Sequence, residues 1–97
     1  MAIVAVFQSP SLTQAKYEET VRRLTGGKSR MASAADWPVK GLVAHVAGQG
    51  PNGFRVVDVW QSEESFQRFG EKLMPILSAV GVEGQPEIYP AHTVVSA

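Results

Sequence analysis

Residues 41–61 constrain the fold of this chain more than any other segment does. Two extended, largely apolar runs, 41–49 and 54–61, flank the tetrapeptide Gly-Pro-Asn-Gly at positions 50–53. Proline fixes one φ angle of a turn and Asn-Gly favours positive φ angles, so this tetrapeptide predicts a tight reversal of the chain. The segment therefore predicts an antiparallel β-hairpin, against which the rest of the chain must pack.

The residues before the hairpin predict a strand, a helix and a loop. The β-branched, apolar run 2–7 predicts a buried strand. A capping-box pattern from Ser11 to Gln14 predicts the start of a helix, and Gly26 predicts its end. Residues 28–40 lack a clear period and predict a long loop with one short helical turn.

The residues after the hairpin predict a second helix and a last strand. Ser62 is a favourable helix cap, and apolar residues follow at helical spacing as far as Val80. Pro75 lies inside this helical pattern and predicts a kink or a restart of the helix. The run 86–95 predicts an edge strand, because Pro90 cannot donate a hydrogen bond to a neighbouring strand.

The predicted order of elements is β-α-β-β-α-β in a single domain over residues 1–97. Two helices on one face of a four-stranded antiparallel sheet give an α+β fold of ferredoxin-like topology. Such a fold leaves the other face of the sheet uncovered. A chain of 97 residues gains from the extra burial that a partner subunit supplies, so we expect a homodimer.

The composition narrows the classes of partner and compartment. Nine Lys and Arg residues balance nine Asp and Glu residues, and no basic stripe is present, so neither nucleic acid nor a membrane surface is an expected partner. The chain has no cysteine and only two histidines, which predicts no metal site and no thiolate chemistry. It has neither a basic leader nor a long apolar run, which favours a cytoplasmic protein.

The register of the hairpin divides its side chains into two faces. With 50–53 as the turn, His45 lies opposite Asp58, and strand alternation then fixes the membership of each face. One face mixes polar and apolar side chains, namely Val43, His45, Ala47, Val56, Asp58 and Trp60. The other is uniformly aliphatic, namely Leu42, Ala44, Val46, Val57 and Val59. We expect the aliphatic face to pack under the helices, and the mixed face to point away from them and form a pocket wall or meet a second sheet.

The mixed face supplies the candidate catalytic residues, His45 and Asp58. A carboxylate beside an imidazole fixes its tautomer and makes it a competent general acid or base. The alternative is a cross-strand pair that satisfies two polar groups at a dimer interface. Trp60, Val43 and Val56 share this face and are candidates for substrate binding.

Three other segments contribute candidates. Trp37 is placed to cover the mouth of the pocket or to anchor the long loop. His92 on the last strand is a candidate substrate-binding residue, with a hydrogen-bonded structural role as the alternative. Tyr17 and Tyr89 have phenols to offer to a substrate, but packing explains each of them more simply.

Residues 41–48 (Gly-Leu-Val-Ala-His-Val-Ala-Gly) and 53–66 (Gly-Phe-Arg-Val-Val-Asp-Val-Trp-Gln-Ser-Glu-Glu-Ser-Phe) resemble small proteins of the dimeric α/β-barrel superfamily. The nearest group in that superfamily is antibiotic-biosynthesis monooxygenase-like. The spacing of residues 69–92 fits the same pattern. The resemblance implies a homodimer, in which two sheets face each other and each subunit encloses a pocket.

The resemblance implies the fold more than it implies a reaction, because the superfamily covers many chemistries. Its monooxygenases combine a tryptophan, matched here by Trp60, with an asparagine earlier on that strand, where this chain has Val56 and Asp58. Its haem-degrading members have an asparagine and a histidine on the second helix, and residues 66–69 contain no histidine. Neither activity is therefore transferred to this chain.

Two classes of function follow from the sequence. The first is a homodimeric enzyme that uses no cofactor and acts on a compact apolar or aromatic metabolite by general acid/base chemistry, with His45 and Asp58 as its catalytic residues. The second is a non-catalytic module that binds a hydrophobic ligand or only dimerises. Haem binding through His45 or His92 ranks third.

Overall fold

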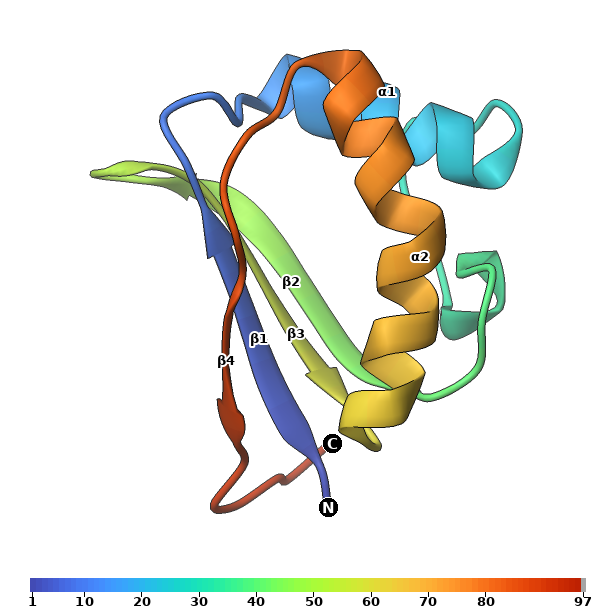
Figure 1. Ribbon diagram of the computed structural model, residues 1–97, viewed down its shortest axis with the longest axis vertical. Coiled ribbons are helices and arrows are strands. Elements are labelled where there is room, and N and C mark those ends of the chain that lie inside the picture. The colour runs from blue at the N-terminus through green and yellow to red at the C-terminus, as the bar shows by residue number, and fades with distance from the viewer. Residues whose placement is uncertain (97) are drawn as a thin grey trace.

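A computed structural model describes residues 1–96 and contains a four-stranded antiparallel sheet with two helices on one of its faces (Figure 1). In chain order the elements are β1 (Ile3–Gln8), α1 (Gln14–Thr25), the 3-10 turn η1 (Ala34–Asp36), β2 (Leu42–Gly50), β3 (Gly53–Trp60), α2 (Glu63–Val80) and β4 (Glu87–Pro90). The strands lie in the order β2-β3-β1-β4. The predicted ferredoxin-like topology is thereby confirmed.

Helix α1 begins two residues later than the capping-box pattern predicts. The side chain of Thr13 caps the helix by accepting a hydrogen bond from the backbone N–H of Lys16. The hydroxyl of Ser11 instead accepts the backbone N–H of Glu83 at 2.7 Å, which ties the start of α1 to the segment before β4. Gly26 ends the helix with φ of 77°, as the sequence predicts.

Helix α2 begins at its predicted cap, since the Ser62 hydroxyl accepts the backbone N–H of Ser65 at 3.1 Å. The helix continues through Pro75 as far as Val80, so no restart occurs there. Pro75 and Glu71 are both exposed, and water can therefore satisfy the carbonyl that loses its helical partner. In residues 1–96 neither helix combines the length and apolar character that crossing a membrane requires.

The last strand is shorter than predicted. Strand β4 covers Glu87–Pro90 of the expected run 86–95, and it lies at the edge of the sheet beside β1, as Pro90 suggests. The long loop 28–40 contains the expected short helical turn, η1.

The register of the hairpin is confirmed from the turn as far as His45, which lies opposite Asp58. Nearer the start of β2 the register slips. Leu42 lies opposite Trp60 and Ala44 opposite Val59, so Val43 is an extra residue in a β-bulge. Val43 is 38% exposed and lines neither cavity described below, so the structure does not bring it to the other candidates for substrate binding.

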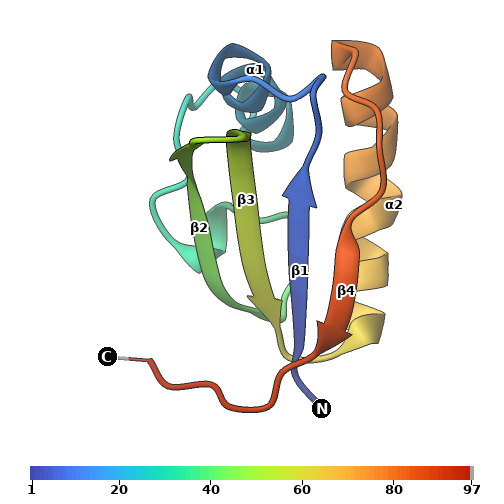
Figure 2. The same cartoon turned by 90° about the vertical axis from the view of Figure 1, so that its left-hand side faces the viewer.

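The assignment of the two hairpin faces is also wrong. The mixed face lies beneath the helices, where Trp60 is fully buried and stacks on Phe69 of α2 with ring centroids 5.1 Å apart. The aliphatic face is the uncovered one: Val46 is 66% exposed, and the strands lie in front of the helices in Figure 2. The prediction assumed that the more apolar face is the one that helices cover. His45 and Asp58 hydrogen-bond each other, and so they tolerate burial.

The core between the sheet and the helices consists of two clusters. One cluster comprises Ile3, Ala5, Trp37, Trp60 and Phe69. The other comprises Leu12, Phe54, Leu77 and Val82. No buried side-chain nitrogen or oxygen in the described part of the chain lacks a hydrogen-bond partner.

Candidate active site

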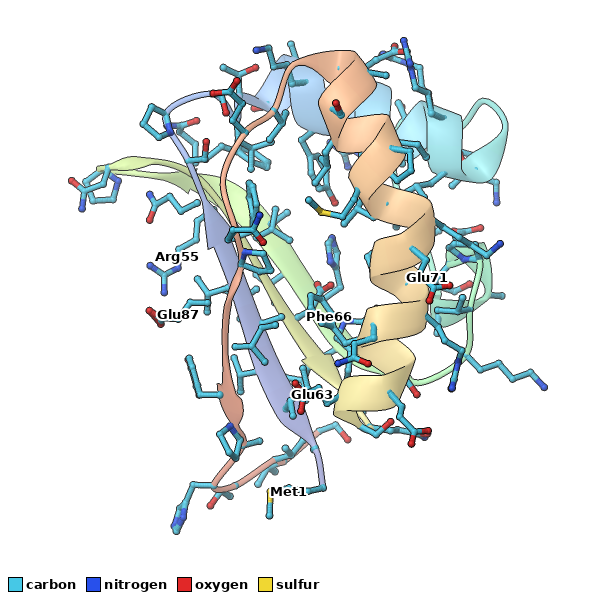
Figure 3. The ribbon with its side chains drawn as sticks, in the orientation of Figure 1. Met1, Arg55, Glu63, Phe66, Glu71 and Glu87 are labelled. Carbon is cyan, nitrogen blue, oxygen red and sulfur yellow. The ribbon has the colours of Figure 1, made fainter. Side chains whose placement is uncertain are left out.

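A cavity of about 430 Å³, here called the inner cavity, lies between the sheet and the two helices. Side chains from every strand and both helices line it, and most are apolar. Phe66 projects from α2 toward the sheet in Figure 3 and forms part of the wall. The volume falls within the range typical of small-molecule sites. His45 and Asp58 are among the polar side chains that line this cavity.

The central pair of the site is His45 on β2 and Asp58 on β3. The His45 Nδ1 atom lies 2.5 Å from Asp58 Oδ1, and the two side chains are 16% and 8% exposed. Strand pairing places them directly opposite each other on the face beneath the helices. A carboxylate accepts hydrogen bonds, so His45 donates its Nδ1–H to Asp58.

Trp60 supports this pair through a hydrogen bond to Asp58. Its indole Nε1–H donates to the second carboxylate oxygen of Asp58 at 3.2 Å. Trp60 is fully buried and is not part of the cavity lining, which corrects its predicted role as a wall against the substrate. It fixes the orientation of Asp58 instead, because each carboxylate oxygen now has its own donor.

Tyr17 on α1 completes the site. Its hydroxyl lies 2.6 Å from His45 Nε2, and the two rings are nearly parallel with centroids 6.0 Å apart. Because His45 carries its proton on Nδ1, its Nε2 accepts the hydrogen bond from the Tyr17 hydroxyl. Burial, reinforced by the negative charge of Asp58, raises the pKa of Tyr17 to about 12. Tyr17 therefore remains a neutral phenol at physiological pH.

These contacts form one hydrogen-bonded chain, Trp60–Asp58–His45–Tyr17, that starts in the core and ends at the cavity. A proton that reaches the Tyr17 oxygen can pass to His45 Nε2, and Asp58 stabilises the imidazolium that results. The chain is thus built for proton transfer. Both ring nitrogens of His45 are engaged in it.

The other predicted site residues fall into two groups. Trp37 and Val56 line the inner cavity, and the indole of Trp37 meets the His45 ring edge-on with centroids 4.8 Å apart. His92 is exposed beyond the end of β4 and lies outside the cavity lining, so the structure does not bring it to the other candidates. Within residues 1–96, no three His, Asp or Glu side chains are grouped closely enough to hold a metal ion.

Tyr17 is the main residue whose role the sequence did not predict. It precedes Val21 by four residues and Leu24 by seven, the spacing of one helix face, and Val21 and Leu24 line the same cavity. A tyrosine on the apolar face of a helix needs a partner for its hydroxyl, and that requirement was the available signal.

No family model matches the sequence, and no curated protein matches it significantly. Among solved structures, the chain is similar to SnoaB, a cofactor-independent oxygenase from Streptomyces nogalater, with a TM-score of 0.58 and 16% identity over 99% of this chain and 96% of that one. A mutant of SnoaB gives a TM-score of 0.59 at the same identity and coverage. A monooxygenase from Streptomyces coelicolor, solved with nanaomycin D, gives 0.49 at 22% identity over 99% of this chain and 91% of that one.

The similarity to SnoaB extends over almost the whole of both chains. At this level of identity it shows a common fold. The resemblance predicted from residues 41–66 is therefore confirmed at the level of the fold.

Proposed function

We propose that the chain is an enzyme that acts on a compact apolar or aromatic molecule by general acid/base catalysis. The observation that carries this proposal is the hydrogen-bonded chain from Trp60 to Tyr17, which ends at an apolar cavity of about 430 Å³. A non-catalytic binding module needs the cavity but has no use for a relay of this kind.

Tyr17 is the group that contacts the substrate in this proposal, and His45 is the base behind it. One proton leaves an acidic C–H or O–H of the substrate for the Tyr17 oxygen, while the original phenol proton moves to His45 Nε2. The substrate becomes an anion and His45 becomes an imidazolium, which Asp58 stabilises. The raised pKa of Tyr17 favours coupled transfer, because a free phenolate is costly in this environment.

A second candidate reaction, oxygenation without a cofactor, is supported by the fold shared with SnoaB, which is described as a cofactor-independent oxygenase. After deprotonation, an electron-rich aromatic CH2 group reacts with O2 to give a carbonyl and water. One oxygen atom enters the product, the other leaves with both hydrogens, and the substrate carbon supplies all four electrons. Proton abstraction by the Tyr17–His45 pair is then the first step of the oxygenation.

Anthrone, a flat ketone with an acidic methylene group, tests both candidates. We expect the protein to accelerate exchange of the methylene hydrogens in D2O without oxygen, followed by NMR, and His45→Ala to reduce that acceleration by about 10²- to 10⁴-fold. His92→Ala is the matched control and leaves exchange unchanged. Equal exchange rates for wild type and His45→Ala would refute acid/base catalysis. Oxygen uptake after admission of air distinguishes oxygenation from proton transfer alone.

We also propose that two copies of the chain pair through the open face of the sheet. This face carries mainly aliphatic side chains on β1, β2 and β3, whereas β4 contributes Glu87 and Tyr89; Arg55 and Glu87 project from it, away from the helices (Figure 3). An exposed apolar surface of this kind typically marks an interaction site. A cytoplasmic location stays a prediction, which fractionation of cells that express the chain would test.

A further inference from the structure

A second cavity, of about 390 Å³ and here called the outer cavity, lies beside the inner one. It is bounded by α1, the first residues of the long loop and β2. Tyr17, His45 and Met31 line both cavities, so the reactive pair forms part of a shared wall. A molecule in contact with the Tyr17 hydroxyl can therefore extend into either space.

The linings of the two cavities differ in chemistry. The inner cavity is walled mainly by aliphatic and aromatic side chains. The outer cavity has an aromatic floor, where Tyr17 and Phe54 lie with centroids 5.0 Å apart. Around that floor stand side chains that form hydrogen bonds, namely Gln14, Glu18, Ser29, Arg30 and Gln49. The pair of cavities thus matches an amphipathic molecule.

The loop that carries Ser29 and Arg30 is fixed on both sides. Lys28 Nζ lies 2.7 Å from one carboxylate oxygen of Asp36, and the other oxygen accepts the backbone N–H of Ala32 at 2.7 Å. These contacts hold the pKa of Asp36 below its ordinary value. The hydroxyl of Thr25 accepts the backbone N–H of Lys28 at 2.9 Å, which joins the loop to α1. The loop wall is therefore formed before a ligand arrives.

The lining of the outer cavity holds one guanidinium, Arg30, and one carboxylate, Glu18. Glu18 accepts a hydrogen bond from Gln14 at 3.3 Å and lies 4.0 Å from Arg22, which pairs more closely with Glu19 at 3.2 Å. Arg30 forms no ion pair with any acidic residue in the described range 1–96. A guanidinium with open donors matches a carboxylate in geometry and charge.

We propose that the outer cavity is a second subsite that binds the carboxylate arm of an amphipathic substrate through Arg30. The flat apolar part of the same molecule lies in the inner cavity, and the arm passes the Tyr17–His45 pair. This proposal rests on the proposed function and specifies its substrate class: aromatic or polycyclic molecules that carry a short acidic side arm.

Two fluorescent probes test the subsite, because they share a flat ring system and differ at the end of the arm. Pyrenebutyrate ends in a carboxylate and pyrenebutanol in a hydroxyl. We expect Arg30→Gln to weaken pyrenebutyrate binding about five- to ten-fold and to change pyrenebutanol binding by less than about two-fold. Arg23→Gln is the matched control, since it removes the same charge from an arginine of α1 that lines neither cavity.

A second variant tests whether the effect on binding arises in the outer cavity. Ser29→Asp adds a negative charge to its wall and is expected to weaken pyrenebutyrate to a similar extent, while the neutral Ser29→Asn leaves both probes unchanged. If Arg30→Gln and Ser29→Asp leave pyrenebutyrate binding intact, or weaken both probes equally, the subsite is refuted. The proposal that the inner cavity binds the apolar part of the substrate is then unaffected. If pyrenebutanol fails to bind the wild-type protein, the inner cavity is not an apolar site, and both proposals fall.

Discussion

The exposure of the two sheet faces is the opposite of what their composition suggests. The more polar face is buried, and the more apolar face is exposed. The face beneath the helices carries an imidazole, a carboxylate and an indole, and its central side chains are buried. The face turned away from the helices carries Ala44, Val46, Val57 and Val59, and it is uncovered. From composition alone, the aliphatic face would be expected to be buried and the mixed face to be exposed.

The difference shows that each face is adapted to what it meets. The helix-facing side is polar where the hydrogen-bonded chain reaches the inner cavity, and each polar group there has a partner. The open side needs no polar groups if a second copy covers it. Four changes test this contrast, described here from the largest expected effect to the smallest.

Trp60→Ala tests the buried side of the contrast. The change removes a fully buried indole and the donor to Asp58, so we expect the free energy of unfolding to fall by about 3–5 kcal/mol in urea denaturation. Val43→Ala, at the exposed bulge, is the control and is expected to cost less than about 0.5 kcal/mol. A loss below about 1 kcal/mol for Trp60→Ala would mean that the helix-facing side is not the main core.

Val46→Asp tests the open side. A carboxylate placed among the aliphatic side chains of this face would be buried without a partner in the proposed dimer. We expect the dimer dissociation constant to rise at least about 30-fold in sedimentation velocity, with the circular dichroism spectrum preserved. Ser78→Asp, on the exposed side of α2, is the control and should sediment as the wild-type protein does. A Val46→Asp protein as dimeric as wild type would place the dimer elsewhere.

Tyr17→Phe tests the proton relay through pH. The folded-state pKa of Tyr17, about 12, lies above the ordinary value of 10.0. Its contribution to stability is therefore complete below pH 10 and is lost as pH rises toward 12. We expect wild type to exceed Tyr17→Phe in unfolding free energy by about 1 kcal/mol at neutral pH, the typical value of one hydrogen bond. This advantage should shrink above pH 10, by about 1 kcal/mol after allowance for solvent screening.

Wild type and Tyr17→Phe are compared between about pH 9 and 11.5, a range that spans roughly the ordinary tyrosine pKa. A constant difference between wild type and Tyr17→Phe across this range would contradict the burial of the Tyr17 hydroxyl.

Gly70→Ala tests whether the absence of a side chain at this position of α2 makes room for a ligand in the inner cavity. Gly70 lies in the middle of the helix and lines the inner cavity, and a Cβ added there meets nothing within 4 Å. We expect a gain in stability of about 0.5–1 kcal/mol and weaker binding of pyrenebutanol. Gly26→Ala should instead destabilise, because φ at Gly26 is 77°. Stabilisation without any loss of binding would show that the ligand does not use this part of the cavity.

The sequence was sufficient to predict the order of elements and the partner of His45. The Gly-Pro-Asn-Gly turn fixes where the hairpin reverses, and strand alternation then places Asp58 opposite His45. The same counting fails near the start of β2, where the bulge moves Val43 out of the face. A bulge depends on contacts with the rest of the sheet, and no local residue pattern at the start of β2 predicts it.

The role of each candidate depended on contacts between distant segments. Trp60 is a donor to Asp58 and not a pocket wall, because α2 packs its ring against Phe69. Tyr17 reaches His45 from a helix 28 residues earlier in the chain, a distance across which a single sequence gives no direct signal. The identity of the chemical groups was readable, but their order along the hydrogen-bonded chain was not.

The two edges of the sheet are protected against uncontrolled growth. Edge strands with free N–H and C=O groups invite further strands to add, which leads to aggregation. Strand β2 forms one edge and is interrupted by the bulge at Val43, while β4 forms the other and ends at Pro90, which has no N–H to donate. Copies of the chain are thereby discouraged from joining edge to edge into fibres, which leaves the aliphatic face as the surface for the proposed dimer.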